Sequence, residues 1–102
     1  MKNFRDKKII ITGAGSGIGR NLAYRFSAEG AEVFLTDINA QTLSETAQEV
    51  IAKGGKCKTY LVDSGNEQQI LDFKEKFLAE EKYADVLINN SGMALGEIEF
   101  TE

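Results

Sequence analysis

A short glycine-rich segment carries the strongest chemical signal in the sequence. The segment is ITGAGSGIG, residues 11–19, with glycines at positions 13, 15, 17 and 19. Glycine costs conformational entropy, so this density is expected where a side chain would keep a ligand away from the backbone. Where such a turn leads from a strand into a helix, its N–H groups and the helix dipole bind an anion such as a pyrophosphate. We therefore predict a phosphate-binding turn, with a merely tight strand-to-helix turn as the alternative.

The spacing of the glycines separates this turn from two other phosphate-binding motifs. The dinucleotide pattern G-x-G-x-x-G fails because Ile18 and Arg20 stand where its third glycine would be in the two possible registers. The phosphate-loop pattern G-x-x-x-x-G-K-[ST] fails as well. The pattern that remains is T-G-x-x-x-G-I-G over residues 12–19.

An aspartate further along the chain indicates which dinucleotide is preferred. Asp37 ends the segment AEVFLTD, 18 residues after Gly19, where a carboxylate can accept both hydroxyls of an adenosine ribose. A 2′-phosphate about 4 Å away would be repelled by several kcal/mol, so Asp37 favours NAD over NADP. Arg20 is close enough in sequence to keep NADP open as the alternative. Asp37 could instead be a strand-end turn residue that helps Asn39 cap the next helix.

Alternating strand and helix patterns would position these residues. Apolar, β-branched runs predict strands, and apolar residues spaced three and four apart predict helices, of which glycines end the first two. The strands are expected at Lys7–Thr12, Ala31–Asp37, Cys57–Asp63 and Asp85–Asn90, and the helices from the glycine turn to Gly30, over Ala40–Lys53 and over Glu67–Glu80. Phe26, Phe73 and Phe77 lie at helical spacing and are expected in the core. The order βαβαβαβ predicts an α/β fold with a doubly wound parallel sheet.

Composition narrows the function further. The chain has 102 residues, which fits one domain over residues 1–102, and a formal charge of −4, which offers nucleic acid no basic surface. The longest apolar run near the start is too short for a signal peptide or a membrane span, so we expect a cytoplasmic protein with no membrane partner. Cys57 is the only cysteine and histidine is absent. We therefore predict that the chain has no disulfide and no metal site.

Two motifs in order resemble those of the short-chain dehydrogenase/reductase family. Residues 12–19 are similar to the family's T-G-x-x-x-G-[IL]-G, and Asn89-Asn90-Ser91-Gly92 is similar to its N-N-A-G at the end of the fourth strand, with Ser91 in place of alanine. The resemblance covers all 102 residues and implies a Rossmann-like fold of which this chain is the cofactor-binding half, cut after the fourth strand.

The resemblance also implies a set of cofactor-binding residues. It places the dinucleotide against Gly13, Gly15, Ser16, Gly17, Ile18, Gly19, Asp37, Ile38, Asp63, Ser64, Asn90, Ser91 and Gly92. In the family, the aspartate at position 63 reaches the adenine amino group; an Asx turn or a helix cap is the alternative for this residue. Asn89 is expected to tie strands together rather than to bind the cofactor.

The family's catalytic pair is missing from these residues. Hydride transfer in the family is assisted by Tyr-x-x-x-Lys, whereas the residues four places after Tyr24, Tyr60 and Tyr83 are alanine, serine and leucine. We therefore name no catalytic residue. We expect this chain to be the amino-terminal part of a longer NAD-dependent oxidoreductase, the parent protein.

The parent protein is expected to interconvert a small alcohol and a carbonyl compound, and to form a homo-oligomer. The alternative is a noncatalytic nucleotide-binding half-domain, which would cover the apolar strand Asp85–Asn90 by pairing with itself or with another chain.

Overall fold

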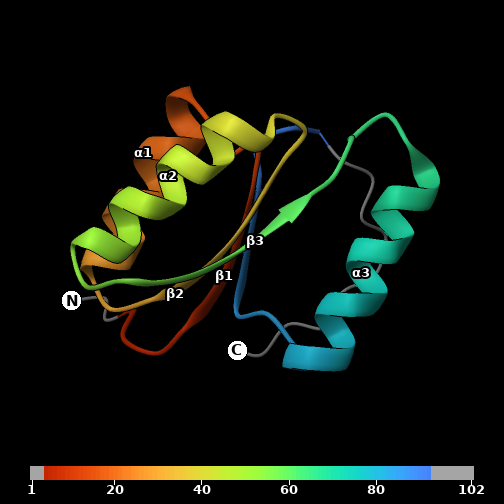
Figure 1. Ribbon diagram of the computed structural model, residues 1–102. Coiled ribbons are helices and arrows are strands. Elements are labelled where there is room, and N and C mark those ends of the chain that lie inside the picture. Colours follow the sequence, from red (N-terminus) through yellow and green to blue (C-terminus); the bar gives the residue numbers. More distant parts are fainter. Residues whose placement is uncertain (1–3, 93–102) are drawn as a thin grey trace.

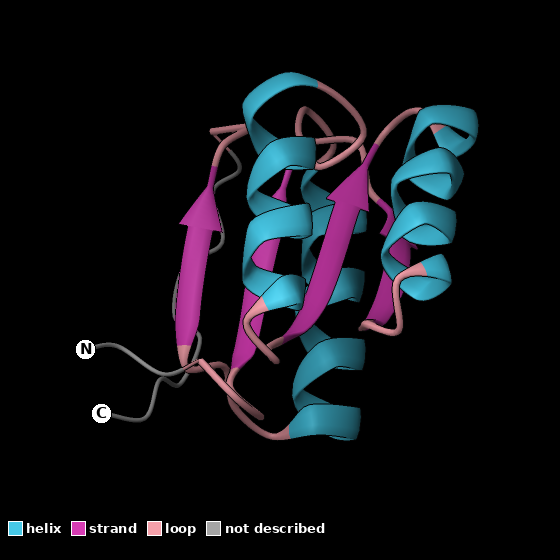
Figure 2. Ribbon diagram, turned by 90° about the vertical axis from the view of Figure 1, so that its left-hand side faces the viewer, coloured by secondary structure: helices cyan, strands magenta, loops and turns pink. Residues whose placement is uncertain are grey.

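Four parallel strands form one sheet in a computed structural model of the chain, which describes residues 4–92. The spatial order of the strands is β3-β2-β1-β4. The strands are β1 (Lys8–Thr12), β2 (Glu32–Asp37), β3 (Lys56–Leu61) and β4 (Val86–Asn89), and the helices are α1 (Gly17–Ala28), α2 (Ala40–Ala52) and α3 (Glu67–Glu81). All four arrows point the same way in Figure 2, so the carboxyl ends of the strands meet at one edge of the sheet. The predicted α/β fold with a doubly wound parallel sheet is confirmed.

Helices cover both faces of this sheet. Figure 1 shows α1 and α2 together on one face and α3 on the other. Alternate residues of β1 divide between the two cores, because Ile9 and Ile11 pack beneath α1 and α2 whereas Ile10 packs towards α3. Phe73 and Phe77 lie in the core beneath α3, and Phe26 packs against the other core, as expected. Between residues 4 and 92, no helix is both long and apolar enough to cross a membrane.

Side-chain hydrogen bonds shift several element ends from their predicted positions. The strand expected to start at Asp85 starts at Val86, because the Asp85 carboxylate accepts from the Lys8 N–H at 2.8 Å. The strand expected to run to Asp63 ends at Leu61, and the Asp63 N–H donates instead to the Gln69 side chain at 2.8 Å. The other ends lie within one residue of prediction, apart from the end of α1, which is Ala28 rather than Gly30. Asn39 caps α2, as its side chain accepts from the Thr42 N–H at 3.0 Å.

A charged cluster lies at the opposite edge of the sheet, where β1 begins. Glu81 at the end of α3 is 8% exposed and accepts a hydrogen bond from Lys58 of β3. Lys8 forms a second ion pair with Glu81 at 3.5 Å. Burial disfavours the Glu81 carboxylate, but the two lysines outweigh this effect, so the pKa of Glu81 is lowered from its ordinary value.

Candidate functional site

The glycine turn sits between the end of β1 and the first turn of α1, at the carboxyl edge of the sheet. Gly17 begins α1 with a φ of +56° and has no atom within 4 Å of the place where a side chain would start. Ser16 is the extended residue before the helix, and its side chain makes no capping bond. The start of α1 thus adjoins open space at Gly17 and has no side-chain cap, as an anion site at a helix N-terminus requires.

Two of the glycines are needed for close packing. A side chain on Gly19 would start 2.2 Å from the Gly13 carbonyl oxygen, so only a hydrogen allows α1 to approach the turn this closely. A side chain on Gly15 would start 2.5 Å from the Thr42 hydroxyl and 2.8 Å from Asp37 Oδ2. The turn is thus packed against both its own helix and the residues that follow β2.

The Asp37 carboxylate is held by backbone groups at the edge of this turn. Its Oδ2 accepts from the Gly15 N–H at 2.8 Å, and its Oδ1 accepts from the Asn39 N–H at 3.0 Å. A carboxylate has about four acceptor positions, so each oxygen retains capacity for a ligand hydroxyl. Asp37 thus helps to start α2, which was the alternative role considered for it. Its oxygens also keep acceptor capacity for a ribose hydroxyl.

Residues from four segments of the chain line a cavity of about 80 Å³. Its lining consists of Gly13, Thr36, Asp37, Ile38, Val62, Ser64 and Ser91. Five of these seven were predicted from the sequence. The hydroxyl oxygens of Thr36 and Ser91 are buried and have no hydrogen-bond partner within the described part of the chain. Two unpaired polar atoms beside a cavity are a feature that a bound polar ligand would explain.

Sequence reasoning missed Thr36 and Val62. Thr36 is 1% exposed and stands between the apolar run Val33–Leu35 and Asp37, which was a usable signal. Val62 lies in an apolar run and gave no such signal. Its place in the cavity depends on where β3 ends beside β2, since its N–H donates to the Asp37 carbonyl at 3.0 Å.

Hydrogen bonds of the N-N-S-G motif tie the end of β4 to the end of β1 and to the turn. The Thr12 hydroxyl donates to Asn89 Oδ1 at 2.9 Å and accepts from the Ser91 N–H at 3.0 Å. The first of these bonds agrees with the structural role expected for Asn89. Asn90 also has a structural role, because its side-chain amide donates to the Gly13 carbonyl at 3.3 Å.

Three predicted residues of the site are largely exposed. Ile18 and Ile38 are large apolar residues with 69% and 65% of their surface exposed; Ile18 lies in the turn, and Ile38 lines the cavity. Gly92 has a φ of +75°, and no atom of the described residues lies within 4 Å of the place where a side chain on it would start. Exposed apolar side chains flanking a polar cavity suit the faces of a planar ring.

The structure does not bring Asp63 into the lining of the cavity. Its Oδ1 accepts from the Gly65 N–H at 2.8 Å, which is an Asx turn, and Asn66 rather than Asp63 caps α3. This is the Asx turn that the sequence left open as an alternative. Its neighbour Ser64 does line the cavity.

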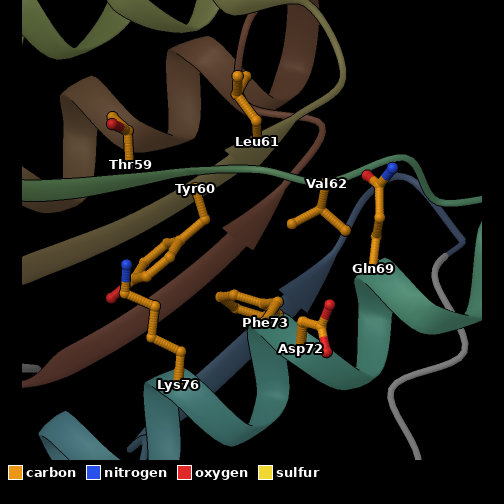
Figure 3. Close-up of a pocket in the computed structure, with 8 residues that line it drawn as sticks. All are labelled: Thr59, Tyr60, Leu61, Val62, Gln69, Asp72, Phe73 and Lys76. Carbon is orange, nitrogen blue, oxygen red and sulfur yellow. The ribbon is translucent and has the colours of Figure 1, made fainter.

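A larger cavity, of about 390 Å³, lies between β3 and α3 (Figure 3). Tyr60 and Val62 point from the strand towards Phe73, whereas Thr59 and Leu61 point away from α3. Burial, followed by the nearby Glu80, raises the pKa of Tyr60 to about 12, so this phenol stays protonated at neutral pH. No residue of the glycine turn lines this cavity, and we therefore place the functional site at the smaller one.

Comparison with known proteins agrees with the geometry. A family model described as short chain dehydrogenase matches residues 7–102. A probable oxidoreductase, EphD, from Mycobacterium tuberculosis is 40% identical over 90 residues, which are 88% of this chain and 15% of that protein.

Two solved structures extend the comparison to the fold. A metagenomic short-chain oxidoreductase in complex with NADP superposes with a TM-score of 0.83 at 31% identity, over 89% of this chain and 41% of the other. A short-chain dehydrogenase/reductase from Burkholderia phymatum in complex with NAD gives a TM-score of 0.77 at 29% identity, over 85% and 31%. The chain therefore spans less than half the length of these relatives. With both motifs at the carboxyl edge of the sheet and the family match over residues 7–102, the chain belongs to the short-chain dehydrogenase/reductase family.

Proposed function

We propose that this chain binds NAD at the carboxyl edge of its sheet. The pyrophosphate lies against the first turn of α1, where Gly17 leaves the backbone N–H groups open. The adenosine ribose lies at the cavity beside Asp37 and Ser64, with the exposed Ile38 next to it. The similar solved structures contain NADP or NAD, which supports a nicotinamide dinucleotide as the ligand.

The preference for NAD over NADP rests on the Asp37 carboxylate. Backbone N–H groups hold both of its oxygens at the mouth of the cavity, where they accept ribose hydroxyls and repel a 2′-phosphate. Repulsion of several kcal/mol at about 4 Å corresponds to a Kd ratio of roughly two orders of magnitude. This carboxylate is the observation that carries the proposal.

Calorimetric titration with NAD and NADP tests the proposal. We expect NAD to bind roughly 100-fold more tightly than NADP. Asp37→Asn should weaken NAD binding and reduce the ratio, whereas Asp72→Asn, the same change at an exposed position of α3, should alter neither. A chain that gives no heat and no rise in melting temperature with saturating NAD or NADH would refute the proposed site. Equal affinity for the two dinucleotides would refute the role of Asp37.

We also propose that the chain is the dinucleotide-binding part of an oxidoreductase that interconverts an alcohol and a carbonyl by hydride transfer. The bound nicotinamide would supply the hydride. No tyrosine of the sequence has a lysine four residues later, so the proton transfer to the substrate oxygen must come from residues outside these 102. The chain alone should bind NADH and should not oxidise it with any carbonyl compound, whereas turnover by the chain alone would refute this division of roles.

The edge of β4 supports a second candidate, a noncatalytic nucleotide-binding domain that pairs with another chain. Within residues 4–92, β4 pairs only with β1, and its apolar residues Val86, Leu87 and Ile88 are only partly buried. The opposite edge strand β3 instead carries the exposed Lys56 and Lys58, which discourage pairing. A stable, concentration-dependent dimer of the 102 residues in ultracentrifugation would favour this candidate, whereas a well-behaved monomer would contradict it. A cytoplasmic location and a homo-oligomeric parent protein remain predictions.

A further inference from the structure

Arg20 in the first turn of α1 is held by three residues of α2. Its Nε donates to the Thr46 hydroxyl at 2.8 Å, and its Nη2 donates to the Thr42 carbonyl at 2.9 Å. The same Nη2 forms an ion pair with Glu45 Oε1 at 3.2 Å. Glu45 is thus the charged partner of this guanidinium, on the exposed surface of α2, with 52% of its side chain exposed.

The Thr46 hydroxyl connects this arginine to the glycine turn. Thr46 is fully buried, and its hydroxyl lies 3.0 Å from the Ala14 carbonyl, to which it can donate while it accepts from Arg20. The Thr42 carbonyl, at 3.2 Å, is a second acceptor for the same hydrogen. The guanidinium is therefore fixed by a network that includes the backbone of the turn itself.

Thr42 accepts from the held arginine and also lies beside Gly15 and Asp37. The Thr42 hydroxyl and Asp37 Oδ2 both lie within 3 Å of the point where a side chain on Gly15 would start, at 2.5 and 2.8 Å. The carbonyl of this same Thr42 accepts from Arg20. Thr42 therefore links Arg20 to the surroundings of Gly15 and Asp37, and the charge of an arginine released from α2 would favour a 2′-phosphate near that carboxylate.

We propose that Glu45 and Thr46 determine the selectivity for NAD by holding Arg20 on α2 and away from the ribose edge. The proposal rests on the dinucleotide site described above. Asp37 repels the 2′-phosphate directly, while Glu45 and Thr46 withhold the nearby cation that would compensate for this repulsion. Selectivity would then depend on two residues of α2 that contact neither the turn ligand nor the ribose.

The test measures the Kd of NAD and of NADP by calorimetry for the wild-type chain and for Glu45→Gln. An exposed ion pair shifts an equilibrium by up to about fivefold, so we expect the Kd of NADP to fall roughly threefold and that of NAD to stay within about twofold. Adding Thr46→Val removes the acceptor of Nε, and the double variant should lower the Kd of NADP roughly tenfold. The single variant changes an exposed residue, so it keeps the test valid if the double variant fails to fold.

Two comparisons separate this effect from a general loss of negative charge. In an Arg20→Gln background, Glu45→Gln should no longer improve NADP binding, because no guanidinium is left to release. Glu49→Gln removes the same charge one turn further along α2, where Glu49 pairs with Lys53 at 3.3 Å, and should leave the NADP to NAD ratio unchanged.

Three results would overturn the inference. An unchanged ratio in Glu45→Gln and in the double variant would show that Arg20 is not restrained in this way. A gain that persists without Arg20, or appears equally in Glu49→Gln, would assign the effect to net charge. A wild-type chain that binds neither dinucleotide would refute the proposed function itself, which is a different result from NAD binding with a ratio that the variants do not alter.

Discussion

Replacing Gly19 with alanine should damage both the stability of the fold and the glycine turn. The added methyl group would start 2.2 Å from the Gly13 carbonyl oxygen and 2.9 Å from its carbonyl carbon. Both contacts are with backbone, so no side-chain rotation can relieve them, and the turn or α1 must move by about 1 Å to restore ordinary packing. Overpacking of this kind costs about 1–3 kcal/mol, which corresponds to a fall in melting temperature of roughly 4–20 °C for a chain of this size.

The same movement should weaken NAD binding, because the Gly13 carbonyl also accepts from the Asn90 side chain. We expect the Kd of NAD to rise roughly tenfold or more, measured by calorimetry beside thermal unfolding. Gly65→Ala is the matched control: its methyl group would meet only Asp63 Oδ1, at 3.4 Å, and should change stability by less than about 0.5 kcal/mol. A Gly19→Ala chain that melts and binds NAD like the wild type would refute the packing argument.

Two further predictions test the open side of the turn and the charged cluster. Gly17→Ala and Gly54→Ala both place alanine at a positive φ in open space, so each should cost about 1–2 kcal/mol, yet only Gly17→Ala should weaken NAD binding in calorimetry. Because the pKa of Glu81 is lowered in the folded chain, its contribution to stability is present above its ordinary pKa of 4.5 and is lost as the pH falls below it. The free energy of unfolding, measured with denaturant from pH 7 to pH 3, should show this loss in the wild type and in the control Glu80→Gln. Glu81→Gln should show a smaller pH dependence. Equal pH dependence in Glu81→Gln and the wild type would contradict the prediction.

Most of the fold could be predicted because local signals agree with each other. The β-branched runs, the apolar stripes and the glycines that follow the first two helices all indicate the same element order, and the helix caps confirm it locally. The strand ends at Asp85 and Asp63 could not be predicted. They depend on hydrogen bonds to Lys8, 77 residues away, and to the side chain of Gln69. Such contacts exist only after the sheet and its helices have come together.

A site residue could be predicted where its position in the chain calls for its residue type. A contact that depends on the packing of α1 against α2 could not be predicted. Asp37 follows from its place at the end of a strand, and it lies at the cavity. The partners of Arg20 lie 22 to 26 residues away, and nothing in the local sequence indicates that they hold it. The sequence therefore left NADP open through Arg20, whereas the structure shows this side chain already paired.

The four glycines of the turn serve different purposes, and this difference explains why the segment is so rich in glycine. Gly19 is required by contact with the backbone of the turn, and Gly15 by the Asp37 carboxylate and the Thr42 hydroxyl, which occupy the space of its side chain. Gly17 alone among the four has open space on its side-chain position, so it is the one whose replacement would intrude on a ligand without disturbing a neighbour. Because the Gly15 N–H also donates to Asp37, a hydrogen bond joins the residue that we propose selects the cofactor to the turn that we propose binds its phosphates. A change that shifts the turn should therefore alter selectivity as well as affinity.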